Sequence, residues 1–199
     1  MGRRSKSHPR CPQCRLHVER CMCDAFRPMA TNTRLLLLLH QREWKKNTNT
    51  GRIALHALEN ATHVLRGLPG EPLDLAELRD PTRRVLLLFP REDAVVLTPE
   101  VMASDPRPVT LVVPDGNWSQ ARRVVRREEA LVQAEAIVPP PGAATRYRLR
   151  DETTDEGMAT AEAVARVLGV LEGPAVQDEI ERLFDLFVTR TLATRGVAT

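Results

Sequence analysis

Three short runs of apolar residues constrain the fold of this chain more than any other feature. They cover residues 34–40, 84–89 and 109–113, and within each run the apolar side chains follow one another without alternation. Such a pattern is typical of strands that are buried on both faces, as in a parallel sheet. The second and third runs end at Pro90 and Pro114, so we expect them to be central strands whose carboxyl ends open into loops.

Helical spacing appears between and after these runs. Apolar residues at 54, 57, 58, 61 and 65 predict a helix that Asn49 or Thr50 caps and Gly67 ends. Residues 118–129, 160–171 and 176–192 predict three further helices, residues 136–138 a short strand, and residues 41–50 a loop. Strands that alternate with helices predict an α/β fold with a mainly parallel sheet flanked by helices.

Polar segments follow the predicted strands at 40–50, 90–93 and 114–120. Because ligands of open parallel sheets bind at the carboxyl ends of the strands, these segments are the first candidates for a site. The chain has no Gly-x-Gly-x-x-Gly motif and no P-loop, which argues against the usual dinucleotide and nucleoside triphosphate sites. Its longest apolar run is too short to span a bilayer and the basic N-terminus lacks a signal-peptide core, so we expect a cytoplasmic protein without membrane contact.

The four cysteines lie close together, at Cys11, Cys14, Cys21 and Cys23. Four thiolates satisfy a tetrahedral zinc ion, and polar and basic residues between the two pairs indicate a loop. Disulfides are disfavoured without a secretory signal, and the spacing does not match the common iron–sulfur motifs. We therefore predict a structural zinc module over residues 1–28, followed by a second domain over residues 29–199.

Basic residues are unevenly distributed, although the net charge is only +3. Residues 1–28 hold seven arginines and lysines against two acidic residues, and a second basic group is Arg122, Arg123, Arg126 and Arg127. Local basic patches favour a polyanionic partner such as nucleic acid. A solvated tail and a solvated helix face are the alternative interpretation.

One segment carries a family resemblance. Residues 115–121, Asp-Gly-Asn-Trp-Ser-Gln-Ala, are similar to the Asp-Gly-Thr-Trp signature of the DTW-domain family, with Asn117 where threonine is commonest. Further segments resemble the family's motifs in the same order: Cys21-x-Cys23, His40-x-x-Glu43, Asn47-Thr-Asn-Thr-Gly51, Leu88-Phe89-Pro90, Tyr147-x-Leu149-Arg150 and Thr160-Ala-Glu162-Ala-Val-Ala165. Together they cover roughly residues 11–170.

The resemblance implies a SPOUT-like fold with a C-terminal trefoil knot, which the periodicity of the sequence does not itself reveal. It also implies an enzyme that transfers the 3-amino-3-carboxypropyl group of S-adenosylmethionine (SAM) to N3 of a uridine in tRNA. A SAM-dependent RNA methyltransferase on the same fold and a non-catalytic zinc-containing RNA-binding protein are the alternatives. The oligomeric state is open, with a monomer slightly favoured.

Asp115 is the candidate general base, because it directly follows a buried strand and a carboxylate can remove the uridine N3 proton. It could instead cap the next helix or hold the α-amino group of SAM. Trp118 is a candidate for stacking on a base or on adenine, or a packing anchor. The residues expected to bind SAM are Leu88, Phe89, Pro90, Asp115, Gly116, Trp118, Leu149, Thr160 and Ala161, where Thr160 could also be a helix cap.

The tRNA is expected to contact polar and basic side chains near the first strand and on the 118–129 helix. These candidates are His40, Glu43, Lys45, Lys46, Asn49, Arg52, Arg122 and Arg123. His40 and Glu43 could instead form a surface salt bridge. Contacts of arginine and lysine with phosphates position an RNA and make its binding dependent on salt.

Overall fold

The computed structural model describes residues 9–68, 70, 72–147, 149 and 158–196. Arg3, Arg4 and Lys6 of the predicted basic tail and Arg150 of the Leu149-Arg150 motif lie outside the described residues. Within the described part of the chain, no helix combines the length and apolar character needed to cross a membrane.

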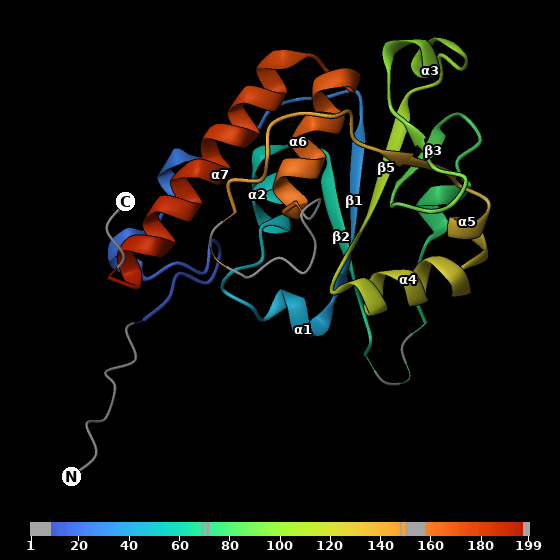
Figure 1. Cartoon of the computed structure of the whole chain (residues 1–199). Helices are drawn as coiled ribbons and strands as arrows, with labels where there is room; N and C mark the ends of the chain where they lie inside the picture. Colours follow the sequence, from blue (N-terminus) through green and yellow to red (C-terminus); the bar gives the residue numbers. More distant parts are fainter. Residues whose placement is uncertain (1–8, 69, 71, 148, 150–157, 197–199) are drawn as a thin grey trace.

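A six-stranded sheet in the order β2-β1-β5-β3-β6-β4 forms the centre of the molecule (Figure 1). Every pairing between neighbouring strands is parallel, which confirms the predicted α/β class. The strands are β1 (Arg34–His40), β2 (Ala61–Arg66), β3 (Arg84–Leu88), β4 (Val95–Val96), β5 (Val109–Asp115) and β6 (Glu135–Val138).

The continuous apolar runs are explained by cores on both faces of this sheet. In β1, Leu35, Leu37 and Leu39 face one core, whereas Leu36 and Leu38 face the other. Because successive side chains of a strand point to opposite faces, both sets must be apolar when helices cover both faces. All five leucines are fully buried.

Helices α2 (Gly51–Ala57), α6 (Thr160–Leu171) and α7 (Pro174–Thr194) supply the first core, with the larger share of the buried side chains. Helices α4 (Trp118–Arg127) and α5 (Glu129–Val132) supply the second core. Two shorter helices are α1 (Gln41–Trp44) and α3 (Pro99–Ala103). The predicted helix over 160–171 is confirmed at both ends, and α7 contains the helix predicted over 176–192 and extends it by two residues at each end.

The predicted helix over residues 54–65 is wrong in its second half. Helix α2 ends at Ala57, Leu58 is already extended, and residues 61–66 form strand β2. β2 lies at the edge of the sheet, where β1 is its one partner among the described strands, and Thr62 and His63 are exposed. Its apolar residues therefore do not form a continuous run, and Ala61 and Leu65 match helical spacing by coincidence.

The sequence also failed to predict three short elements. Residues 41–44 form α1 inside the predicted loop, and β4 and α3 were not expected. The helix predicted over 118–129 is divided, because Glu128 is extended and caps α5. Such short elements offer too few residues for a periodic pattern.

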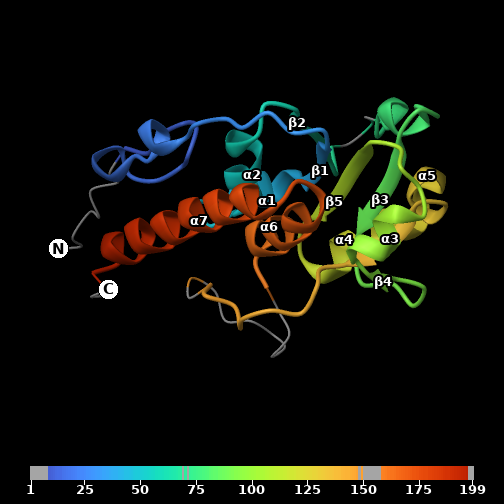
Figure 2. The same ribbon diagram turned by 90° about the horizontal axis from the view of Figure 1, so that it is seen from above.

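Residues 9–28, which hold the four cysteines and are called the cysteine segment below, lie along α7 (Figures 1 and 2). Leu16, Met22 and Phe26 are buried in the same core as α7. Arg190 of α7 donates to the Cys21 carbonyl, and Arg182 Nη2 donates to the Ala25 carbonyl at 3.3 Å. The segment thus shares its apolar side chains with the main core, and a boundary between two domains at residue 28 stays a prediction. The SPOUT-like trefoil knot also stays a prediction.

Candidate functional site

Asp115 is the last residue of β5, and its carboxylate is buried where three segments meet. Asn49 Nδ2 donates to Asp115 Oδ2 at 2.6 Å, and Thr160 Oγ1 donates to Asp115 Oδ1 at 3.1 Å. Asp115 stands beside Leu39 in the register of β1 and β5, which brings the 47–51 segment after β1 close to it. Asp115 does not cap α4, because Asn117 does so with Gln120 in a capping box.

Gly51 gives the Asp115 carboxylate the space that it occupies. A Cβ atom at position 51 would lie 2.7 Å from Asp115 Oδ2 and 3.1 Å from Leu37 Cδ1. The neighbouring Thr50 is the N-cap of α2, and its Oγ1 accepts from the Ala161 amide at 3.3 Å. The Asn-Thr-Gly motif therefore joins β5 to the start of α6.

Glu162 holds the start of α6 against residues 145–146. Its buried carboxylate accepts from Thr145 Oγ1 at 2.5 Å, from the Arg146 amide at 2.8 Å and from the Ala159 amide at 2.9 Å. Tyr147 follows, and its hydroxyl donates to the Thr48 carbonyl at 2.7 Å. Thr160 is the first residue of α6, after the N-cap Ala159, so its hydroxyl serves Asp115 and does not cap the helix.

Trp118 begins α4 with about half of its surface exposed, and its ring lies 6.1 Å from that of buried Phe89. Leu88 is buried at the end of β3, and Pro90 is exposed. An exposed indole beside the end of the sheet is a surface on which a base can stack. Leu149 is buried in the core with α7, and its carbonyl accepts from Arg195.

Arg66, at the end of β2, ties this edge of the sheet together. Its guanidinium donates to the carbonyls of Leu38, Asp115 and Gln120. Gly116 permits this approach, since a Cβ atom there would lie 2.9 Å from Arg66 Nη2. Burial lowers the pKa of Arg66, and the nearby Asp115 opposes this shift.

His40 and Arg123 line a cavity of about 390 Å³ next to this edge, together with Arg66, Gln120 and Arg127. Burial and the nearby arginines lower the pKa of His40, and its Nδ1 accepts from the Arg42 amide. Arg122, Arg123, Arg126 and Arg127 are all exposed, as the basic patch requires.

Other predicted tRNA contacts fall around α1. Glu43 is buried and pairs with Lys46, so it does not form the surface salt bridge with His40 considered from sequence. Lys45 and Lys46 are exposed, but Arg52 is 4% exposed. The Arg52 guanidinium lies 3.6 Å from the centre of the Trp44 ring, and His63 stacks on the same indole at 4.7 Å.

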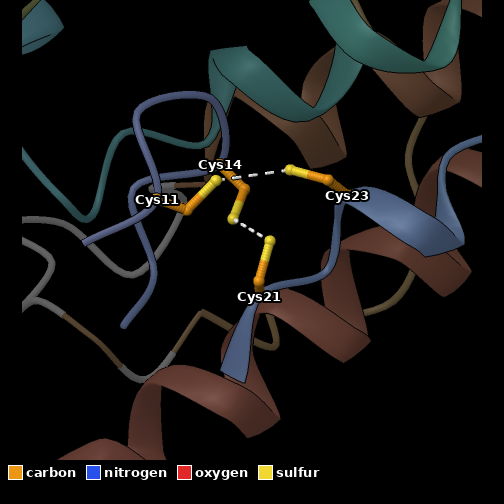
Figure 3. A group of neighbouring side chains, drawn as sticks. All are labelled: Cys11, Cys14, Cys21 and Cys23. Atoms are coloured by element: carbon orange, nitrogen blue, oxygen red, sulfur yellow. Dashed lines mark hydrogen bonds between the residues drawn. The ribbon is translucent and has the colours of Figure 1, made fainter. Parts of the chain in front are cut away.

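The four cysteine side chains point toward one another (Figure 3), and their sulfur atoms lie within 4.8 Å of one another. Cys11 Sγ lies 3.5 Å from Cys23 Sγ, and Cys14 Sγ lies 3.7 Å from Cys21 Sγ. A zinc–sulfur bond of about 2.3 Å makes the edge of a tetrahedron about 3.8 Å, so these positions fit a zinc ion. Burial and the neighbouring thiols raise the pKa of Cys14 and of Cys23, and a bound cation would offset this cost of ionisation.

A larger cavity, of about 670 Å³, lies at the opposite end of the sheet. Its lining includes Arg79, Asp80, Arg83 and Glu135 and contains no residue that the motifs single out. We place the candidate site at Asp115 because the predicted motifs meet there, and not at the larger hollow.

The structure brings together Asn49, Asp115, Thr160 and Ala161 from the predicted set. It adds Trp44 and Arg66, which sequence reasoning missed. Arg66 had no signal, because its strand was predicted as a helix. Trp44 lies in the 41–50 segment, which was predicted as a loop. An aromatic residue next to basic residues in this segment is a signal for RNA binding that the sequence analysis did not use.

The fold and the site define a parallel α/β protein that holds a buried carboxylate at the carboxyl end of a central strand. The model of the DTW domain family matches residues 8–192, and the chain belongs to this family.

Similar proteins carry consistent names. The chain is 29% identical over 170 residues to "tRNA-uridine aminocarboxypropyltransferase 2" of Drosophila melanogaster, covering 82% of this chain and 66% of the relative. It is 24% identical over 173 residues to the protein of the same name from Macaca fascicularis, covering 84% and 58%. It is 26% identical over 201 residues to "tRNA-uridine aminocarboxypropyltransferase A" of Arabidopsis thaliana, covering 86% and 75%. The chain thus spans less than two thirds of the first two relatives.

Among solved structures, the chain resembles one titled "Structure of the SAM-dependent rRNA:acp-transferase Tsr3 from Vulcanisaeta distributa". The TM-score is 0.49 and the sequence identity 16%, over 82% of this chain and 79% of that chain. A likeness at this level carries no inference about the present site.

Proposed function

We propose that this protein transfers the 3-amino-3-carboxypropyl group of SAM to N3 of a uridine in tRNA and releases methylthioadenosine. The observation that carries the proposal is the contact of three motif segments at one carboxylate, where Asn49 and Thr160 both donate to Asp115. The names of the similar proteins support the same reaction.

The reaction sets three requirements for the residues of the site. In this reaction the bond between uridine N3 and Cγ of SAM forms as the Cγ–S bond breaks, and the sulfur keeps the electron pair of the broken bond. The proton on N3 must also leave. SAM supplies an activated carbon through its sulfonium, so positioning accounts for much of the rate. The uridine must also leave its stack to reach the site.

Asp115 is the proposed proton acceptor. Its two oxygens accept hydrogen bonds from Asn49 and Thr160, which hold the carboxylate in a fixed orientation. General base catalysis by a positioned carboxylate contributes about 10²- to 10⁴-fold. Holding the α-amino group of SAM is the alternative role for the same side chain.

The remaining contacts with SAM are proposed from the loops around Asp115. Backbone groups of Leu88, Phe89, Pro90, Gly116, Leu149, Thr160 and Ala161 would line its pocket. Trp118 would stack on adenine or on the displaced base, because its ring is exposed beside Phe89.

The tRNA would bind across the basic rim formed by Lys45, Lys46, Arg122 and Arg123, with His40 at its centre. Exposure of these lysines and arginines supports phosphate contacts, which position the RNA without reading its sequence.

Zinc at the four cysteines would stabilise the segment that packs on α7. The SPOUT-like knot, the separate module over 1–28, the cytoplasmic location and the monomeric state are further parts of this proposal.

The direct test is incubation of the purified protein with SAM and unmodified tRNA, followed by mass spectrometry of the nucleosides. We expect a uridine that carries the aminocarboxypropyl group, with an equal amount of methylthioadenosine. A methyl-sized mass gain with S-adenosylhomocysteine would identify a methyltransferase instead. RNA binding without any SAM binding would identify a non-catalytic protein.

Asp115→Asn tests the role of the carboxylate, because the amide keeps the shape but does not accept the proton. We expect the rate to fall about 10²- to 10⁴-fold while tRNA binding is retained. Asp80→Asn is the control, since Asp80 lies at the other end of the sheet and pairs with Arg34. Equal rates for Asp115→Asn and the wild-type protein would exclude the base role.

A further inference from the structure

Arg52 has a buried guanidinium with an unused hydrogen-bond donor. The residue is 4% exposed, and Arg52 Nε has no partner among the described residues. Its Nη2 donates to the Trp44 carbonyl, and its guanidinium covers the Trp44 ring. Buried charged groups are normally paired, so a buried donor of this kind is able to bind an anion.

Arg15 repeats this feature beside Arg52. Arg15 Nε is also buried without a hydrogen-bond partner in the described part of the chain. Its backbone is in the left-handed region, at a φ of 64°, which is uncommon for a residue other than glycine. The cysteine segment packs on α2 at this point, since Gln13 and Phe26 contact His56, one helical turn after Arg52.

The two like charges raise the cost of burying Arg52. Burial and then the charge of Arg15 lower the pKa of Arg52 to about 10, whereas Asp115 and Cys14 oppose the shift. No ion pair within 4.0 Å joins Arg52 to Asp115 among the described residues, although Asn49 Nδ2 donates to Asp115 and Asn49 Oδ1 accepts from the Arg52 backbone amide. The charges of Arg15 and Asp115 thus both act on the Arg52 guanidinium, and Asn49 joins the backbone of Arg52 to the Asp115 carboxylate.

We propose that Arg52 and Arg15 form an oxyanion site beside Asp115. The site would take a planar or tetrahedral oxyanion through the two Nε donors, because guanidinium groups recognise carboxylate and phosphate alike. Two sources share this chemistry and rest on the proposed function. They are the α-carboxylate of SAM, whose α-amino group would face Asp115, and a phosphodiester of the tRNA.

The experiment measures the dissociation constants of SAM, of decarboxylated SAM and of unmodified tRNA for the full-length protein. Decarboxylated SAM lacks only the carboxylate, so it isolates that group. The variants are Arg52→Lys and Arg15→Lys, which keep the charge and remove the Nε donor, with Arg42→Lys as an exposed control on α1. Thermal melting verifies folding, and Arg15→Lys, at a half-buried position, provides the test if Arg52→Lys does not fold.

For a carboxylate, we expect both variants to weaken SAM binding about 10-fold or more and to leave decarboxylated SAM within about 2-fold of the wild-type value. For a phosphate, tRNA binding weakens by a similar factor, while SAM binding is unchanged. Either result supports the site and identifies its source.

The oxyanion site is overturned if folded variants bind all three ligands as the wild-type protein does. It is also overturned if they lose only bound zinc, since the donors would then serve the cysteine cluster. In both cases a wild-type protein that still modifies tRNA leaves the proposed function intact. A wild-type protein that binds neither SAM nor tRNA would contradict the function and the oxyanion site together.

Discussion

Gly51 shows how one residue without a side chain sets the geometry of the candidate site. It lies between the Asp115 carboxylate and Leu37 of β1, where a Cβ atom would collide with the carboxylate and crowd the Leu37 side chain. The Asp115 carboxylate can approach the 49–51 segment closely only because position 51 is glycine. The Asn49 hydrogen bond to Asp115 depends on this close approach.

Gly51→Ala should therefore displace the Asp115 carboxylate. We expect the rate of tRNA modification to fall about 10²-fold, because a shift of about 1 Å at a reacting group has this effect. The free energy of unfolding should fall by about 1–3 kcal/mol from overpacking. The measurements are the initial rate of nucleoside formation and urea denaturation.

Gly142→Ala is the matched control for this substitution. The three atoms nearest to a Cβ atom at position 142 would belong to the guanidinium of Arg166, the first at 3.0 Å, and that flexible group can move. An unchanged rate in Gly51→Ala would show that the close approach has no part in activity.

At the scale of elements, Glu162 fixes the start of α6. Its carboxylate accepts hydrogen bonds from Thr145 and the Arg146 amide, and a third from Ala159, the N-cap residue of the helix. Thr160, at the start of α6, contacts Asp115, and Tyr147, which follows Arg146, contacts Thr48. In the sequence, Glu162 stood out only as part of the motif over residues 160–165. Its buried position gives it a role in joining segments distant in sequence.

Glu162→Gln should lower the free energy of unfolding by about 1–3 kcal/mol. The glutamine NH₂ group, a donor, would replace a carboxylate oxygen and would then face a donor that now has no acceptor. Glu179→Gln on α7 removes a solvent-exposed pair with Arg182 and should cost less than about 1 kcal/mol. Urea denaturation measures both. Equal losses in the two variants would contradict the role of Glu162.

The contact of α2 with the cysteine segment should depend on pH through His56. Burial, together with the charge of Arg52, lowers the pKa of His56 below its ordinary value of 6.5. Below that value the unfolded chain binds more protons than the folded chain, so stability is lost as the pH falls. We expect the free energy of unfolding to decrease from about pH 7.5 to about pH 5.5.

His56→Gln should reduce this pH dependence, as measured by urea denaturation across the same range. The four cysteine thiols contribute equally to both proteins. Their contribution therefore cancels when the free energies of unfolding of variant and wild type are subtracted at each pH. The same slope in both proteins would show that His56 does not contribute.

At the scale of the whole molecule, the cysteine segment acts as part of the main core. It contributes Leu16, Met22 and Phe26 to the core with α2 and α7, and arginines of α7 donate to its carbonyls. Ordering of this segment by a metal should therefore stabilise α2, and with it the 49–51 segment beside Asp115.

Loss of the metal should destabilise the entire protein. We expect one zinc per chain by elemental analysis, and Cys14→Ser should lose it and lower the thermal midpoint by about 5–15 °C. Val18→Ser, an exposed position of the same segment, is the control and should retain the metal. A Cys14→Ser protein with unchanged metal and midpoint would exclude a four-cysteine zinc site.

Much of the fold was predictable from sequence where burial leaves a local pattern. β1, β3 and β5 were predicted because strands covered on both faces need apolar residues at every position. β2 was not, because a sheet edge relaxes this demand and leaves Thr62 and His63 exposed. The conformation of an edge strand depends on the strand beside it. That strand lies elsewhere in the sequence, so the residues of the edge strand alone do not reveal it.

The candidate site likewise has features that were predictable from the sequence and features that were not. Sequence alone determined its candidates: an aspartate after a buried strand, a cluster of four cysteines, and motifs in family order. Only the tertiary structure decided that β5 lies beside β1, and thus that Asn49 and Thr160, 66 and 45 residues away along the chain, hold Asp115. It also decided that Arg52, expected at a phosphate-binding surface, is buried next to Arg15. Residue chemistry and apolar patterning are local properties of a chain, whereas the neighbours of a buried group depend on the order of the strands.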